Sequence, residues 1–395
     1  MEGLQALNSS LGGERFLMSN ITKHSRKVKF KDLPPEEQKA EQIRKYESIW
    51  RFKKALCDEI QKRAGKDSHR WEVGERIKTC SCYGEIKEYL LDNFRIRKTR
   101  KCHQSVCPAC QASKSNTRVR NLTGVLGLLN NEREQKGLDK VNVFEFEISP
   151  KNCEDLEAGV RSCFEIVEKC FGSHGHGKFF TRSAEILGGH VSFEITRNRI
   201  DNTWHPHFHG SIWVDPLKVP QGFTSWFEYN EFWVNDELCF FNYWGYQLYL
   251  YIRDNLKKQS FVRCAPARNL YETVKYSMKP NCIDSDKSTG LKPFEALDAW
   301  DVLRKLKKQT FRTYGLLRKL DVEDENLLSH GREYILWSFC HWDTTGKYQE
   351  ETDGVVHLEQ DESQRDEKVL DKLTSGSPPA EIEDKYFFDS VSGEL

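Results

Sequence analysis

The chain has 395 residues with 60 basic and 60 acidic side chains, so its formal net charge at pH 7 is zero. A hydrophobic content of 38%, with 10 Trp, 14 Tyr and 23 Phe, is ample for a folded core of one large or two modest domains. No run approaches the roughly 20 apolar residues of a membrane span, and residues 1–5 lack the features of a signal peptide. We therefore expect a cytoplasmic protein without a membrane partner.

The charges are unevenly distributed along the chain. Residues 349–395 hold 14 acidic and 4 basic side chains, a net charge of −10, so the rest of the chain carries +10. Residues 93–120 carry eight Lys or Arg and no acidic residue, and residues 302–320 carry seven and none. Such blocks suit a phosphate-binding surface, because each neutralised phosphate releases counterions, although many charge runs are only solvated faces.

The first 75 residues are polar and show no candidate chemistry. Residues 38–63 are predicted to form a helix, because apolar side chains recur at helical spacing after Pro34 and Pro35.

Cysteines cluster between residues 80 and 110. The chain has 13 cysteines, an odd number, and no secretion signal, which favours a reducing compartment and metal thiolates over disulfides. Four thiolates can close a tetrahedral structural zinc site. The best set is Cys82 (or Cys80), Cys102, Cys107 and Cys110. The choice between Cys80 and Cys82 stays open, His103 is a possible substitute ligand, and free buried cysteines are the alternative without a metal.

Basic residues surround these cysteines, so we expect a zinc-stabilised element that contacts DNA. The candidate DNA-binding side chains are Arg97, Lys98, Arg100, Arg118 and Arg120.

Helices and strands then alternate. Residues 121–136 predict a helix that ends near Gly137. In residues 141–148, apolar side chains alternate with Glu145 and Glu147, which is typical of a half-buried strand. Residues 152–171 fit a second helix.

A hairpin is predicted next. Residues 190–196 alternate as a strand that includes Glu194, and residues 198–202 are typical of a turn. Residues 204–214 follow as the second strand of the hairpin.

Three histidines alternate at the start of that second strand. Side chains at i and i+2 leave the same face of a strand, so His207 and His209 point together into one site. His205 precedes Pro206 and lies at the beginning of the strand. Two imidazoles held side by side on a rigid strand can clamp a divalent cation. The alternative is an aromatic-rich strand with exposed histidines.

A third ligand would come from a neighbouring strand. Glu194 is preferred, because it lies on the predicted partner strand with the right alternation, and Glu147 and Glu145 are competitors. Mg²⁺ or Mn²⁺ suits chemistry on a phosphate, and imidazole ligands favour Mn²⁺.

Residues 269–279 read as a helix that Pro280 stops. Glu272 and Tyr276 are four residues apart and share one helix face, which Lys275 and Lys279 flank. A tyrosine beside a carboxylate and lysines suits covalent attack on a phosphate, with Glu272 activating water. The alternative is an ordinary amphipathic surface helix. From about residue 349 the acidic tail is predicted to be disordered.

The order of these three motifs resembles that of plasmid rolling-circle replication initiators of the HUH endonuclease superfamily. The likeness is to the branch with one active tyrosine and an upstream zinc-binding element, and it spans about residues 78–320. The most specific motifs of this resemblance are His205-Pro206-His207-Phe208-His209 and Cys102-x4-Cys107-Pro108-x-Cys110.

This resemblance implies roles for particular residues. His207 and His209 would be metal ligands, Tyr276 the nucleophile, and Glu272 the carboxylate that activates water at termination. The implied reaction nicks one strand of a plasmid origin, leaves a 5′-phosphotyrosine and frees a 3′-OH that primes the host polymerase. The implied partners are a hairpin or single-stranded nick site in origin DNA and the host helicase and polymerase.

The predicted fold class is α+β, with mostly antiparallel strands flanked by helices. The resemblance implies a central five-stranded antiparallel sheet of the HUH or ferredoxin-like type behind the zinc-binding element. We expect a variable helical region at 1–75, a zinc-binding DNA-contact element at 76–120, a nicking domain at 121–325 and a C-terminal extension at 326–395.

Three other functions compete with this interpretation. An HUH-type transposase is similar up to the tyrosine helix but often carries two active tyrosines. A histidine-triad nucleotide hydrolase would use one of the alternating histidines as its nucleophile, and would leave the cysteines and the basic blocks unexplained. A non-catalytic zinc-knuckle protein would bind DNA without cleaving it.

Overall fold

The computed structural model describes most of the chain between residues 33 and 373. The described residues are 33–65, 68–89, 93–99, 101–171, 186–216, 228–234, 237–256, 260–271, 273–274, 290–324, 327–328, 334–342, 348–351, 369–370 and 372–373. Within them, no helix combines the length and the apolar character needed to cross a membrane.

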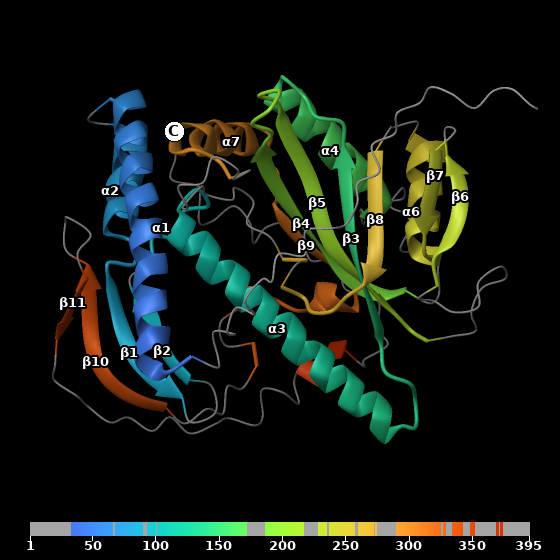
Figure 1. The fold of residues 1–395 in the computed structure, drawn as a ribbon, viewed down its shortest axis with the longest axis horizontal. Helices are drawn as coiled ribbons and strands as arrows, with labels where there is room; N and C mark the ends of the chain where they lie inside the picture. Colours follow the sequence, from blue (N-terminus) through green and yellow to red (C-terminus); the bar gives the residue numbers. More distant parts are fainter. Residues whose placement is uncertain are drawn as a thin grey trace, which may run out of the picture.

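A five-stranded antiparallel sheet forms the centre of this described part (Figure 1). Its strand order is β8 (Ser260–Pro266), β3 (Asn142–Pro150), β5 (Trp204–Val214), β4 (Ile186–Arg197) and β9 (Phe311–Gly315). Each strand pairs antiparallel with its neighbours, and helices flank the sheet. The predicted α+β class with a central antiparallel sheet is confirmed.

β4 and β5 form the predicted hairpin. In the turn between them, the backbone N–H of Asn198 donates to the carbonyl of Thr203 at 2.9 Å. Asn202 has a φ of 56°, a left-handed conformation that asparagine tolerates better than most residues. The resulting register places Glu194 directly opposite His207.

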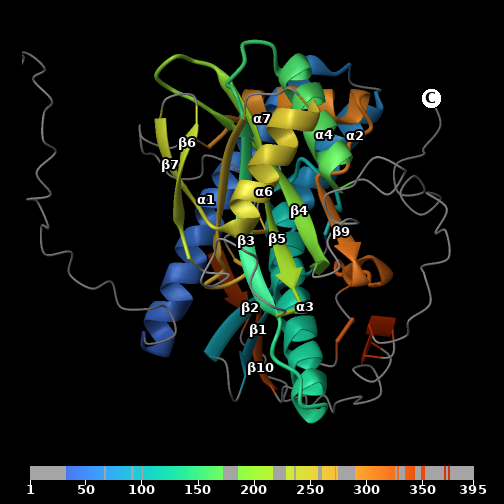
Figure 2. The same cartoon turned by 90° about the vertical axis from the view of Figure 1, so that its right-hand side faces the viewer.

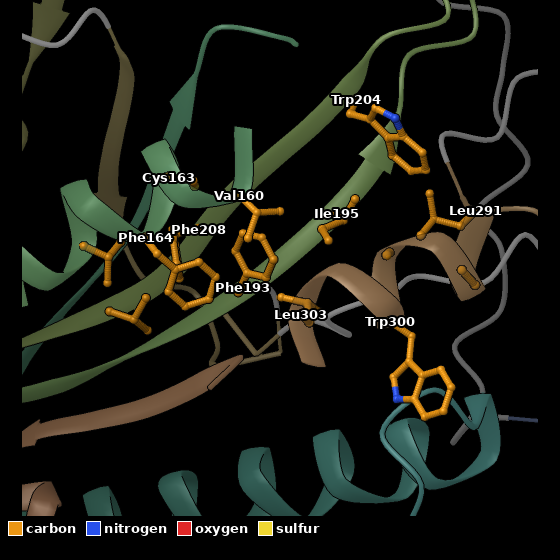
Figure 3. Packing of buried hydrophobic residues seen from close by; sticks show 14 of the residues in the cluster. Val160, Cys163, Phe164, Phe193, Ile195, Trp204, Phe208, Leu291, Trp300 and Leu303 are labelled. Atoms are coloured by element: carbon orange, nitrogen blue, oxygen red, sulfur yellow. The ribbon is translucent and has the colours of Figure 1, made fainter. Parts of the chain in front are cut away.

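One face of the central sheet carries the main hydrophobic core. α4 (Leu156–Phe171) packs across it, and the ring of Phe164 lies 4.7 Å from that of Phe193 and 5.1 Å from that of Phe208. Figure 3 shows these rings between α4 and the sheet, with α7 (Pro293–Lys305) beyond them. This packing holds β4 and β5 rigid, and so fixes the opposite face, from which the histidines project.

The opposite face is covered at one end by α3 (Pro108–Gln135). Val119, Leu122 and Val125 of this helix form a second hydrophobic cluster with Trp213 of β5. The site described below lies on this face, beyond the end that α3 covers.

Two helices begin at different residues than predicted. α3 begins at Pro108 rather than at residue 121, because a proline at the first helical position has no N–H that would need a partner there. α4 begins at Leu156 rather than at residue 152, because the backbone of Cys153 pairs with that of Trp204 at 2.9 and 2.7 Å.

The N-terminal helices stand beside α7. The helix predicted at residues 38–63 is confirmed as α1 (Pro35–Arg63), and α2 (His69–Thr79) packs along it. Arg63 Nη1 donates to Asp298 Oδ1 of α7 at 2.7 Å.

A four-stranded sheet joins segments from the two ends of the chain (Figure 1). Its order is β11 (Tyr348–Glu351), β10 (Tyr334–Trp342), β1 (Tyr83–Tyr89) and β2 (Asn93–Thr99).

The prediction of disorder from residue 349 onward is therefore wrong where the structure describes the tail. Pairing with β10 orders β11, and Val369 and Leu373 are buried in the second hydrophobic cluster. Residues 352–368 and 374–395 lie outside the described residues.

The remaining elements lie mainly beside the edge strand β8. They are β6 (Asn230–Val234), β7 (Glu237–Phe241), α6 (Tyr243–Tyr251), the π-helix η2 (Ile252–Leu256) and, after β9, the 3₁₀ turn η3 (Leu316–Lys319). Figure 2 shows the β6–β7 pair outside the central sheet. Asn242 caps α6 and donates to the carbonyl of Cys264 in β8 at 3.3 Å.

Candidate active site and metal centres

The predicted metal ligands lie on one face of the central sheet. Glu194 pairs with His207 across β4 and β5, and Glu147 pairs with His209 across β3 and β5. Directly opposed residues of an antiparallel pair project from the same face. The face therefore gathers two imidazoles from the central strand and one carboxylate from each neighbouring strand.

Glu194 contacts both imidazoles. Its Oε2 lies 3.2 Å from Nε2 of His207 and 3.1 Å from Nε2 of His209. Glu194 and His207 are each 5% exposed. Nδ1 of His207 donates to the carbonyl of His205 at 3.0 Å, which orients the ring and directs Nε2 into the site.

These contacts shift the pKa values of the two groups in opposite directions. Burial opposes ionisation of Glu194, but hydrogen bonds from His207 and His209 outweigh it and lower the pKa of the carboxyl group. Burial also opposes protonation of His207, but the hydrogen bond and charge of Glu194 outweigh it and raise the pKa of the imidazole. The carboxylate thus stays ionised in a buried place, as a cation ligand must.

Glu147 offers a second carboxylate to the same site. One of its oxygens lies within 4.8 Å of the ligand nitrogens of His207 and His209. The third candidate, Glu145, instead lies 3.7 Å from the guanidinium of Arg263 and does not join this group in the described part of the chain. Two imidazole nitrogens with carboxylate oxygens fit the predicted Mg²⁺ or Mn²⁺.

His205 stands beside this group. Its ring stacks on that of His207 with centroids 4.5 Å apart. Burial, followed by the charge of His207, lowers the pKa of His205 and favours the neutral ring.

Four cysteine sulfurs form a second candidate metal centre. Those of Cys80, Cys102, Cys107 and Cys110 all lie within 4.8 Å of one another. Hydrogen bonds from the neighbouring thiols, that of Cys102 foremost, lower the pKa of Cys80 and of Cys110. Four convergent sulfurs of this kind suit a structural zinc ion, and we call this group the cysteine tetrad.

Cys80, and not the predicted Cys82, belongs to the tetrad. Cys80 follows the last residue of α2 and is buried, with its sulfur 3.4 Å from that of Cys110. The thiol of Cys82 turns away and donates to the carbonyl of Lys78 at 3.3 Å. The end of α2 thus decides which of the two cysteines reaches the tetrad, and the choice of Cys82 is corrected.

We expect Cys110→Ser to reduce both zinc content and the yield of folded protein, because a structural zinc ion contributes to the free energy of folding. Cys82→Ser is the matched control and should resemble wild type in both. Elemental analysis after mild chelation and thermal unfolding would measure the two effects. A Cys110→Ser protein as stable as a zinc-containing wild type would contradict the structural role.

The described backbone just before Tyr276 is anchored over the central sheet. Nε2 of His190 donates to the carbonyl of Thr273 at 3.3 Å. Ser115 Oγ of α3 donates to the carbonyl of Val274 at 3.0 Å. Two successive carbonyls are therefore held, one by β4 and one by α3.

This anchor shares a sheet face with the metal ligands. His190 lies opposite Ser211, which is two positions along β5 from His209. Ser211 Oγ and Nδ1 of His190 are 2.7 Å apart, and the indole N–H of Trp213 donates to Ser211 Oγ at 3.0 Å. Burial lowers the pKa of His190 to about 3, so the ring stays neutral and Nε2 carries the proton.

Sequence reasoning missed the anchoring roles of His190, Ser211 and Ser115. The signal available was alternation, because His190 and Glu194 share one strand face. Nothing in the sequence showed that Thr273 would lie against it.

The predicted helix at residues 269–279 does not begin where expected. The described residues from Asn269 to Val274 form turns and bends. Asn269 Oδ1 accepts from the N–H of Tyr271 at 2.9 Å, and Thr273 Oγ1 donates to the carbonyl of Leu270 at 2.8 Å. Such local side-chain bonds compete with helix formation.

The remaining predicted residues of this segment lie outside the described residues. They are Glu272, Lys275, Tyr276 and Lys279.

Arg118, a predicted DNA-binding residue, is paired within the protein. Its guanidinium donates to Glu323 Oε1 and lies 4.1 Å from the ring centre of Phe311. Its side chain is 11% exposed. A carboxylate of the protein therefore already neutralises the charge of Arg118, and its contact with DNA stays a prediction.

The other candidates for DNA contact remain predictions. Arg120 is exposed on α3. Arg97 and Lys98 are described only in their backbone on β2, and Arg100 lies outside the described residues.

Residues 93–365, more than half of the chain, match the replication protein family Rep_1. The chain belongs to this family. The match covers β5, which carries the three histidines, and three of the four tetrad cysteines. Cys80, α1 and α2 precede it. Comparisons with curated proteins and with solved structures gave no match.

Membership of Rep_1 bears out the resemblance to rolling-circle plasmid replication initiators. It favours a replication initiator over an HUH-type transposase and a histidine-triad hydrolase. The protein's partner is accordingly expected to be plasmid origin DNA.

Proposed function

We propose that this replication protein nicks one strand of a plasmid origin through attack of Tyr276 on the scissile phosphate. The observation that carries the proposal is the group formed by His207, His209 and Glu194 on one sheet face. The same face anchors the backbone at Thr273 (through His190), three residues before Tyr276. An anchored nucleophile-bearing segment beside a cation site is the arrangement that phosphoryl transfer needs.

The proposed nicking step exchanges one phosphate ester for another. The Tyr276 hydroxyl oxygen bonds to phosphorus, and the bond from phosphorus to the 3′ oxygen of the preceding nucleotide breaks. The tyrosine proton is released to water, and the leaving oxygen takes up a proton to become a 3′-OH. The 5′-phosphate stays on Tyr276.

The side chains of the site divide the supporting roles. His207 and His209, with Glu194 or Glu147, would hold Mg²⁺ or Mn²⁺, which supplies positive charge that draws electron density from the phosphate. The Nε2 atoms that contact Glu194 are the atoms that would bind the cation, so cation binding would replace these hydrogen bonds. The carbonyl of His205 orients the ring of His207 through Nδ1. Lys279 is proposed to add a positive charge near the attacking oxygen.

The proposal extends to partners and to the second metal. The tetrad would hold structural Zn²⁺, and Arg97, Lys98, Arg100 and Arg120 would contact phosphates near it. The substrate would be a hairpin or single-stranded nick site, and the freed 3′-OH would serve a host polymerase and helicase in the cytoplasm.

The test is covalent capture of origin DNA. Wild-type protein is incubated with single-stranded origin oligonucleotides labelled on either side of the nick, with Mn²⁺ or with excess chelator. We expect the label 3′ of the nick to travel with the protein in a denaturing gel, and only when Mn²⁺ is present. Undiminished cleavage in chelator, without an adduct, would point to the histidine-triad alternative.

Glu272→Ala should separate initiation from termination. The first nick does not need activated water, so its rate should stay near wild type, whereas the second cleavage should slow by roughly two to four orders of magnitude. In a plasmid replication assay, the readout is multimeric single-stranded product that runs past the origin. An equal loss of first-strand nicking would assign Glu272 to metal binding or to structure instead.

A further inference from the structure

A buried lysine lies against the cysteine tetrad. Lys53 of α1 is 3% exposed. Its Nζ donates to the carbonyl of Cys80 at 2.7 Å and lies 3.6 Å from the sulfur of Cys82. Among the described side chains, none brings a carboxylate within ion-pair distance of this ammonium group.

The walls around Lys53 are mostly apolar. Ile49, Trp50 and Ala109 line the same small hollow as Lys53 and Cys80. Burying an ammonium group in such surroundings is costly unless a negative charge compensates it. The carbonyl of Cys80 is neutral and does not supply that charge.

A metal-loaded tetrad would supply it. Four thiolates around one Zn²⁺ carry two net negative charges. Cys80, whose carbonyl accepts from Lys53, is one of the four tetrad residues. Among the described residues, the tetrad in its zinc-bound form is therefore the group that can compensate the charge of Lys53.

We infer that Lys53 is the counterion of the zinc-loaded cysteine tetrad, and that it makes the docking of α1 depend on zinc. This inference rests on the proposed zinc site and not on the nicking chemistry. It gives a role to α1, which lies before the region that matches Rep_1. The N-terminal helices supply both the upstream cysteine and the balancing charge, so they belong to the zinc-binding element.

The test compares zinc binding by full-length Lys53→Met and Lys45→Met proteins in a reducing buffer. Methionine keeps an unbranched stem and removes the charge. Lys45 is exposed on the same helix and serves as the matched control. Competition with a chromophoric chelator should show a zinc affinity 10- to 100-fold weaker for Lys53→Met, and close to wild type for Lys45→Met.

Thermal unfolding with and without zinc separates charge balance from packing. Lys53→Met should be less stable than wild type when zinc is bound, yet no less stable when zinc is removed, because the uncompensated buried charge is gone. Equal destabilisation in both states would show that Lys53 only packs. Zinc affinity equal to that of Lys45→Met would also overturn the inference.

Two further measurements test the inference even if Lys53→Met folds poorly. Lys53→Arg retains the cation and should keep most of the zinc affinity. In wild type, zinc removal should speed hydrogen exchange in α1 and leave α4 unchanged. An equal rate of hydrogen exchange in α1 with and without zinc would overturn the inference. A wild-type protein that binds no zinc would remove the zinc site itself, whereas loss of nicking alone would affect only the proposed function.

Discussion

Tyr276→Phe should lose the covalent protein–DNA adduct and nicking altogether, a fall of at least about 10³-fold in rate. The substitution removes one hydroxyl oxygen, which is the atom proposed to attack the phosphate. Binding of origin DNA and thermal stability should stay close to wild type, because the ring is kept. Adduct formation on a labelled single-stranded oligonucleotide measures the loss, and gel shift and thermal unfolding measure what is retained.

Tyr271→Phe is the matched control for this experiment. Tyr271 lies in the same segment and is 62% exposed, so its hydroxyl is free to react if the assignment is wrong. It should form the adduct at the wild-type rate. If Tyr276→Phe kept the adduct and Tyr271→Phe lost it, the nucleophile would be Tyr271.

The sheet face of the site could be predicted because its chemistry follows the period of a strand. Alternation in two segments and a turn between them were enough to pair β4 with β5. That pairing brings Glu194 opposite His207. The register is well specified, because a shift of one residue would turn the side chains of a strand to the other face of the sheet. Glu147 could only be named as a competitor, because the pairing of β3 depends on tertiary contacts.

The cysteine tetrad shows where sequence spacing stops being informative. Cys80 and Cys82 lie two residues apart, and either could follow a helix end within the usual uncertainty of such boundaries. The structure ends α2 at Thr79, which directs Cys80 inward. The role of Lys53 depends on a contact across 27 residues of chain, which no local pattern encodes.

The anchor under the tyrosine segment was also beyond prediction. The bonds from His190 and Ser115 join β4 and α3 to the backbone of Thr273 and Val274, which lies more than 80 residues away in the chain, and no local pattern predicts such contacts. The predicted helix does not begin at Asn269, because local side-chain bonds of Asn269 and Thr273 compete with helix formation there.

The second large effect is expected at the proposed cation site, where Glu194 and Glu147 are alternative carboxylate ligands. Glu194→Gln should weaken Mn²⁺ binding by at least 10- to 100-fold, which is the usual cost of removing a group that hydrogen-bonds to a metal ligand. The rate of cleavage should fall as well. Glutamine is close to glutamate in shape and can still bond the imidazoles, so the fold should survive. What it lacks is the negative charge that the buried site holds between His207 and His209.

Glu147→Gln is the matched comparison on the other neighbouring strand. Glu147 is partly exposed, and its Oε1 already accepts a hydrogen bond from Ser149 at 3.0 Å. We therefore expect a smaller loss of Mn²⁺ affinity, measured by calorimetry or by paramagnetic resonance of free Mn²⁺. A larger loss in Glu147→Gln than in Glu194→Gln would make Glu147, and not Glu194, the carboxylate ligand. Unchanged affinity in both proteins would mean that the cation is not held by this sheet face.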